Sequence, residues 1–113
     1  MAAIANLTID QGTTFSSDVT VKDSNGNAFD LTGYTAEAKM AKGYSSTRTR
    51  TTMTTTIAAD ATTGVVTLSL TATETAGLDA ERYVYDLEIT QTSSSNVTRV
   101  IEGIITVRPQ VSI

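Results

Sequence analysis

A chain of 113 residues has room for one domain with its own core, and we take residues 1–113 as a single domain. Histidine and cysteine are absent from the sequence, which removes the commonest general base, the commonest metal ligand and any disulfide, so we expect neither a cofactor nor a metal. The formal net charge of −4 argues against a nucleic-acid partner, and apolar runs of only a few residues argue against a membrane segment or a secretion signal.

The first strand candidates are separated by turns. Residues 5–9 alternate apolar and polar side chains, and a turn at Asp10-Gln11-Gly12 ends the run. The next run, residues 13–22, places Phe15 and Val19 on one face, as a half-buried strand does. Residues 23–27 then predict a tight hairpin turn, because Asn25-Gly26 offers the positive backbone dihedrals that such turns need.

Residues 30–42, with the sequence DLTGYTAEAKMAK, combine helix-forming residues with a strand pattern. Their apolar side chains fall on every second position: Tyr34, Ala36, Ala38 and Met40. Burial of one such face outweighs helix propensity, which is worth only tenths of a kcal/mol per residue, so we predict a strand. Asp30 is expected to cap the turn before this strand through its side chain, while Gly33 supplies the backbone freedom.

The segment 47–57 is threonine on nearly every position and has few apolar anchors. A strand of this kind has few apolar side chains to bury in a core on either side, so we expect it at a sheet edge or against another chain. The candidate assembly surface consists of Arg48, Arg50, Thr52, Thr54 and Thr56. The alternative is a merely soluble edge strand, because arginine and threonine also serve to block edge pairing.

Residues 65–78 predict a strand followed by a single helical turn. Residues 65–70 alternate apolar and polar side chains, as in a half-buried strand. Thr71 then has Glu74 three residues later, which is the pattern of a capping box. The helix that follows is too short to be a substantial element, so we interpret it as a crossover between strands.

Two long strand candidates complete the sequence. Residues 81–90 alternate cleanly, and the apolar face carries Tyr83, Tyr85, Leu87 and Ile89. Residues 97–109 are apolar on both faces for part of their length, so we expect this last strand to be central in its sheet. Gly103, inside this strand, is the expected site of a β-bulge.

Seven short strands with regular turns and no substantial helix predict an all-β fold, specifically an antiparallel two-sheet β-sandwich of immunoglobulin-like type. A closed barrel is the alternative. Tyr83 follows a corner at residues 78–82, where such sandwiches place a tyrosine whose hydroxyl binds nearby backbone. We therefore expect a structural role for Tyr83.

The order of these motifs resembles a family of small structural proteins of tailed bacteriophages, which includes the immunoglobulin-like N-terminal domain of baseplate upper proteins. The matching pieces are the Gly12 turn, Asn25-Gly26, Asp30-Leu31-Thr32-Gly33, the strand end Leu68-Ser69-Leu70-Thr71, Tyr83-Val84-Tyr85-Asp86, and the closing Gly103-x-x-x-Val107-x-Pro109. The resemblance covers nearly the whole chain.

This resemblance implies a non-enzymatic virion component, most often of the tail, baseplate or fibre-attachment region. Its partners would be copies of itself, as a homo-oligomer in the assembled particle, and other virion proteins. It would be located in the virion, and in the host cytoplasm before assembly. Decoration of the capsid and a place in the neck are alternatives that the resemblance leaves open.

Two further functions were weighed against this hypothesis. Asp86 and Glu88 share a strand face, as a glycosidase pair does, but nothing in the sequence encloses them and tryptophan is absent, so we expect a solvated face and no enzyme. A glycan-binding module for attachment to the host surface is the second alternative. It would use Tyr34 and Tyr44 as a small aromatic platform.

Overall fold

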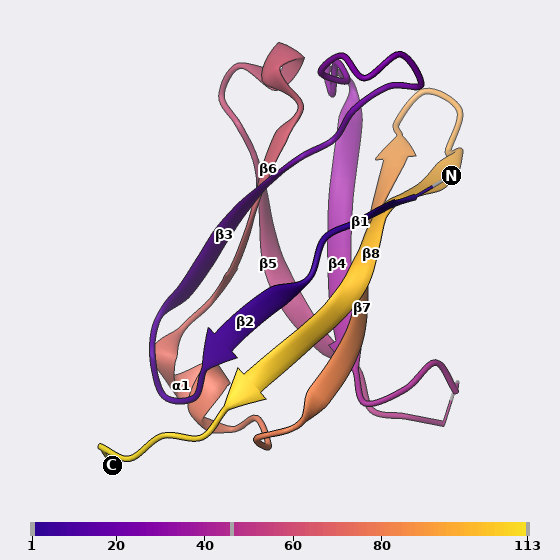
Figure 1. Ribbon diagram of the computed structural model, residues 1–113. Helices are drawn as coiled ribbons and strands as arrows, with labels where there is room; N and C mark the ends of the chain where they lie inside the picture. The colour runs from indigo at the N-terminus through magenta and orange to yellow at the C-terminus, as the bar shows by residue number, and fades with distance from the viewer. Residues whose placement is uncertain (1, 46, 113) are drawn as a thin grey trace.

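Residues 2–45 and 47–112, the part of the chain that this computed structural model describes, form eight strands and two short helices (Figure 1). The strands are β1 (Ala3–Ile4), β2 (Leu7–Asp10), β3 (Phe15–Thr20), β4 (Tyr34–Ala41), β5 (Thr51–Ile57), β6 (Val65–Leu70), β7 (Arg82–Gln91) and β8 (Val97–Arg108). The helices are η1 (Ala61–Thr63) and α1 (Ala72–Ala76). The predicted all-β class is confirmed. None of the helices in the described ranges has the length and apolar character that crossing a membrane demands.

The strands pair in one continuous, curled path, in the order β1-β8-β7-β4-β5-β6-β3, with β2 also paired to β8. Most neighbours are antiparallel, but β1 and β2 run parallel to β8, so the expectation of a fully antiparallel arrangement is wrong. The turn at Gly12, whose φ is 77°, takes the chain from β2 to β3. Strand β3 then pairs with β6 and leaves β2 beside β8.

Strand β5 passes from one group of strands to the other. Its residues 51–53 pair with β4, whereas residues 54–57 pair with β6. Each half of β5 therefore pairs along one side only, so the expected edge position holds for each half, although the path as a whole continues through the strand. Two side chains attach β5 to the rest of the fold: Met53 is fully buried, and the Thr55 hydroxyl donates a hydrogen bond of 2.9 Å to the Ala36 carbonyl of β4.

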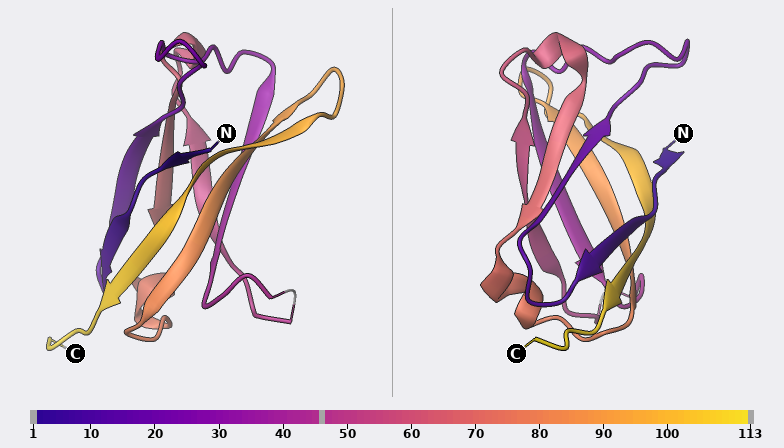
Figure 2. Two further views of the ribbon diagram at one scale, coloured as in Figure 1. Left: turned by 45° about the vertical axis from the view of Figure 1, so that its right-hand side comes forward. Right: turned by 60° about the vertical axis from the view of Figure 1, so that its left-hand side comes forward.

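The two ends of the path have free edges, at β3 on one end and at β1 and β2 on the other. These edges do not pair with each other within the described residues, so the path stays open and the alternative of a closed barrel is not formed. Figure 2 shows the resulting shape, in which β3 and β6 lie across from β7 and β8.

The core lies between these strands and confirms the period-two pattern. Residues 30–42 include a strand and no helix, and Ala38 and Met40 are buried on its inner face. The predicted inward faces of β3, β6 and β7 are also confirmed. Their buried side chains are Phe15, Val19, Val66, Leu68, Leu70, Tyr83, Tyr85, Leu87 and Ile89.

Strand β8 is central, as predicted, because β7 lies on one side of it and β1 and β2 lie on the other. Its irregularity is not at Gly103, which pairs regularly with Tyr85. The register shifts instead where Leu87 pairs with Ile101 and Glu88 pairs with Arg99, so the residue between them is left over. The predicted bulge at Gly103 is thus wrong in position.

Gly103 has a different role, which is to allow close approach of the chain between β1 and β2. A Cβ atom built at Gly103 would overlap the carbonyl oxygen of Ala5. That same oxygen accepts a hydrogen bond from the hydroxyl of Tyr85, the partner of Gly103 across the sheet. Burial raises the pKa of Tyr85 to about 12, because the low-dielectric interior disfavours its charged form.

Most of the turns and helix caps that the sequence predicts are present in the structure. The Asp30 carboxylate accepts a hydrogen bond of 3.0 Å from the Thr32 N–H, and Gly33 has a φ of 80°, which confirms this segment as the turn that begins β4. Thr71 and Glu74 form the predicted capping box of α1. The turn at residues 23–27 is confirmed, but only Gly26 of the expected pair has a positive φ.

Candidate interaction surface

The exposed threonines of β5 form the part of the predicted assembly surface that the structure brings together. Thr52, Thr54 and Thr56 are all exposed and lie on alternate positions of one strand. Arg48 and Arg50 are exposed too, but they precede the strand, in the loop that follows β4. Contact of this surface with another chain stays a prediction, and so does addition of a strand along the side of β5 that each half leaves unpaired.

Arg50 has a structural task in that loop. Its guanidinium donates hydrogen bonds to the carbonyls of Ser45 at 2.7 Å, Arg48 at 2.9 Å and Tyr44 at 3.3 Å. A guanidinium that binds three carbonyls closes the loop on itself. Stabilisation of this loop therefore explains Arg50 better than contact with another chain does.

The outer face of β4, β7 and β8 carries a network of charges. Asp86 lies opposite Lys39 on β4 and opposite Glu102 on β8. Arg99 bridges two of these carboxylates, with N–O distances of 3.1 Å to Asp86 and 3.7 Å to Glu102. Because these groups are partly exposed, each pair contributes little to stability, and the network mainly fixes the charge pattern of the face.

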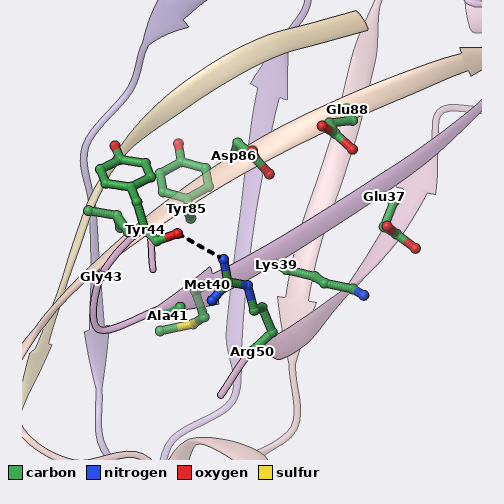
Figure 3. A pocket seen from close by; sticks show the side chains of 11 residues that line it. Glu37, Lys39, Met40, Ala41, Gly43, Tyr44, Arg50, Tyr85, Asp86 and Glu88 are labelled. Carbon is green, nitrogen blue, oxygen red and sulfur yellow. Dashed lines mark hydrogen bonds between the residues drawn. The ribbon is translucent and has the colours of Figure 1, made fainter. Parts of the chain in front are cut away.

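A shallow hollow of about 150 Å³ lies on this face (Figure 3). In Figure 3, Glu37 and Lys39 project from β4, Asp86 and Glu88 project from β7, and the loop with Tyr44 and Arg50 borders the other side. The hollow is smaller than the cavities that bind most small ligands. Its polar rim and open form suit contact with another surface.

Asp86 and Glu88 do not form a glycosidase pair. They stand two positions apart on the same face of β7 and do not face each other across a cleft. Asp86 is held by Arg99, and Glu88 pairs in register with Glu37 and Arg99. In the described part of the chain no group of three acidic side chains is placed to hold a metal ion.

An apolar row crosses the charged face, and the sequence reasoning missed it. Ala41, Val84 and Ile104 are paired in register on β4, β7 and β8. Ile104 is 41 % exposed, and the adjoining Tyr44 is 65 % exposed. Only part of the signal was present in the sequence, because Val84 occupies an outward position between the charged residues Arg82 and Asp86.

The two tyrosines of the predicted glycan platform are far apart. Tyr34 begins β4, and Tyr44 follows its other end. The Tyr34 ring packs edge-on against Phe29, with ring centroids 5.3 Å apart and an interplanar angle of 81°. The platform is therefore not assembled by these two residues.

At the base of β7, a cluster of hydrogen bonds fixes the chain. The Tyr83 hydroxyl binds the backbone of Asp79, which confirms the predicted structural role of this tyrosine. Lys42 forms ion pairs with Asp79 and with Glu81, the latter at 2.8 Å. The hydrogen bonds that the Lys42 ammonium donates to the carboxylates of Asp79 and Glu81 hold the pKa of Lys42 above its usual range.

Comparison with known proteins finds similarity among solved structures. No family model matches the sequence, and no curated protein matches it. Among solved structures, the crystal structure of the Lin-41 filamin domain is similar, with 16 % sequence identity, a TM-score of 0.49, and coverage of 89 % of this chain and 82 % of that one.

Proposed function

We propose that this chain is a non-enzymatic structural protein of a tailed-phage virion, which mediates protein–protein assembly in the tail, baseplate or fibre-attachment region. The observation that carries this proposal is the ordered set of motifs that resembles the phage family. In the fold, the Gly12 turn redirects the chain, the Asp30-to-Gly33 turn starts β4, and Tyr83 ties down the start of β7. The motifs are thus determinants of the fold, as expected for a shared scaffold.

The finer architecture that we propose is a two-sheet β-sandwich of immunoglobulin-like type. One layer would contain β1, β2, β8, β7 and β4, and the other β6 and β3 (Figure 2). The support for this division is β5, whose two halves pair with different layers. The hydroxyl of Tyr83, bound to the backbone at the preceding corner, is a further feature of such sandwiches.

The exposed side chains of two faces support assembly through surface contacts. Threonines project from β5, and a mixed field of charges surrounds an apolar row on β4, β7 and β8. Surfaces of this kind make contacts by complementarity of shape and charge. The proposed partners are copies of the chain and other virion proteins.

Immunogold labelling of phage particles tests the proposal. Antibodies against the purified protein should label intact virions of the phage that encodes it, at the tail, baseplate or fibre attachment. Labelling of the capsid shell or the neck would favour decoration or a neck role instead. Purified virions that contain none of the protein by mass spectrometry would overturn the proposal.

A glycan array distinguishes the proposed structural role from the remaining alternative, a glycan-binding module. The proposed structural role predicts no specific glycan signal. A strong signal that is abolished by Tyr44→Ala, and retained by Tyr34→Ala, would identify a carbohydrate-binding module.

A further inference from the structure

The outward residues of β7 follow a distinct order of charge. From the start of the strand the first four are Arg82, Val84, Asp86 and Glu88, and therefore one cation, one apolar residue and two carboxylates. Adjacent strands extend the apolar position sideways into the row of Ala41, Val84 and Ile104. Along β7, the apolar row thus separates Arg82 from Asp86 and Glu88, while Lys39 and Arg99 flank these two carboxylates on the neighbouring strands.

We propose that this face binds a second copy of the chain about a two-fold axis that runs along the apolar row. Rotation about such an axis reverses the strand direction and places β7 of one copy over β7 of the other. Val84 then lies over its own counterpart, and Arg82 of each copy faces Asp86 of the other. The same operation stacks the two Ile104 side chains and removes their exposed surface from water.

The positions of the charges fit this symmetry. Arg82 and Asp86 each lie two residues from Val84, which is about 7 Å along a strand in either direction. An isologous interface requires that a group and its complement lie at equal distances from the axis. A face with this property is complementary to itself, which is the reason to infer a second copy in preference to an unrelated protein.

Both charged groups have capacity for a new partner. Arg82 is exposed and forms no ion pair with any other described residue. Asp86 is ion-paired with Arg99 through Oδ2, which leaves its Oδ1 to accept from a second guanidinium. A carboxylate between two guanidiniums is favourable because one negative charge interacts with two cations.

Sedimentation velocity of the purified chain over a range of concentrations tests the interface. This inference rests on the proposed function in one respect only, namely that the chain acts through contacts between proteins. The experiment uses the purified chain and needs no virion. We expect a reversible dimer. Arg82→Glu should weaken it by about tenfold or more, because it places two like charges together. Asp86→Arg should do the same, and the double variant R82E/D86R should restore most of the affinity.

Two matched controls make the result specific. Lys22→Glu changes the net charge as Arg82→Glu does, but it lies on the exposed turn after β3, and it should leave the dimer intact. Ile104→Lys should abolish the dimer, whereas Val111→Lys, at a 94 % exposed residue of the C-terminal tail, should not. Circular dichroism and thermal unfolding of every variant establish that each one is folded.

Three outcomes would overturn the inference. The first is a wild-type chain that stays monomeric at all accessible concentrations. The second is a dimer that is unaffected by Arg82→Glu and Ile104→Lys, because it must then use another face. The third is an equal loss of affinity in Lys22→Glu, which would reflect net charge alone. Failure of virion labelling together with a dimer that meets these tests would remove the phage role and leave the interface standing.

Discussion

The hydroxyl of Tyr83 accepts a hydrogen bond of 3.0 Å from the Asp79 N–H and lies 3.2 Å from the Asp79 carbonyl oxygen, to which it donates. One side chain thereby fixes the corner that leads into β7. Tyr83→Phe should lower the free energy of unfolding by about 1 kcal/mol, because both backbone groups lose this partner but can reach water. Urea denaturation measures the change.

The matched control for this prediction is Tyr34→Phe. The Tyr34 hydroxyl makes no hydrogen bond to the described residues, while its ring packs against Phe29 as before. Loss of stability in Tyr34→Phe equal to that in Tyr83→Phe would contradict a specific role for the corner.

Gly103→Ala should destabilise the fold by about 1–3 kcal/mol, because the added methyl group would force Ala5 away from β8. Displacement of Ala5 also breaks the hydrogen bond from Tyr85. Gly77→Ala is the control, since its Cβ would meet no atom closer than 3.5 Å. Thermal unfolding of the two variants should show a clear loss for Gly103→Ala and little change for Gly77→Ala.

Alkaline pH should weaken the fold through Tyr85. Its folded pKa is raised to about 12, whereas an unfolded tyrosine has a pKa of about 10. The protonated form is favoured in the folded state, so this contribution to stability is fully present below pH about 10 and is lost as pH rises through about 12. Urea denaturation between these limits should show falling stability.

Tyr85→Phe provides the comparison for the pH series. The variant should be less stable at neutral pH, because the Ala5 carbonyl loses its donor. Its stability should also fall less steeply at alkaline pH. A parallel decline in the variant and the wild type would assign the alkaline effect to other groups, among them Tyr83, whose pKa burial also raises.

Thr55→Val should cost about 1 kcal/mol of stability, because the Thr55 hydroxyl is the donor that links β5 to the Ala36 carbonyl of β4. The substitution keeps the branched shape and removes only the hydroxyl. Thr56→Val, at an exposed position of the same strand, should be nearly neutral. Chemical denaturation of both variants checks the difference, and equal effects would contradict the role of this bond.

Local features of this fold could be predicted from the sequence because their causes are local. Alternation of Tyr83, Tyr85, Leu87 and Ile89 was enough to give the inner face of β7. Side-chain capping was enough to give the turn at Asp30 and the helical turn after Thr71.

Features that depend on partners distant in sequence could not be predicted. The threonines of β5 predict an edge strand, but only the pairing of its two halves shows that they form edges beside two different strands, β4 and β6. Gly103 looks like a bulge, and its real constraint is Ala5, almost a hundred positions earlier in the chain. The apolar row of Ala41, Val84 and Ile104 likewise exists only once three strands are in register.

The parallel pairing of β2 with β8 has a consequence for folding. Asp10 and Arg108 form an ion pair of 2.7 Å across 98 positions of sequence, so the first and last long segments must meet before either is fully paired. Contacts this distant in sequence slow folding, since loop closure must precede the gain from pairing. We therefore expect the fold to be completed only after synthesis of β8, because β8 is the strand with which β1 and β2 pair in the described part of the chain.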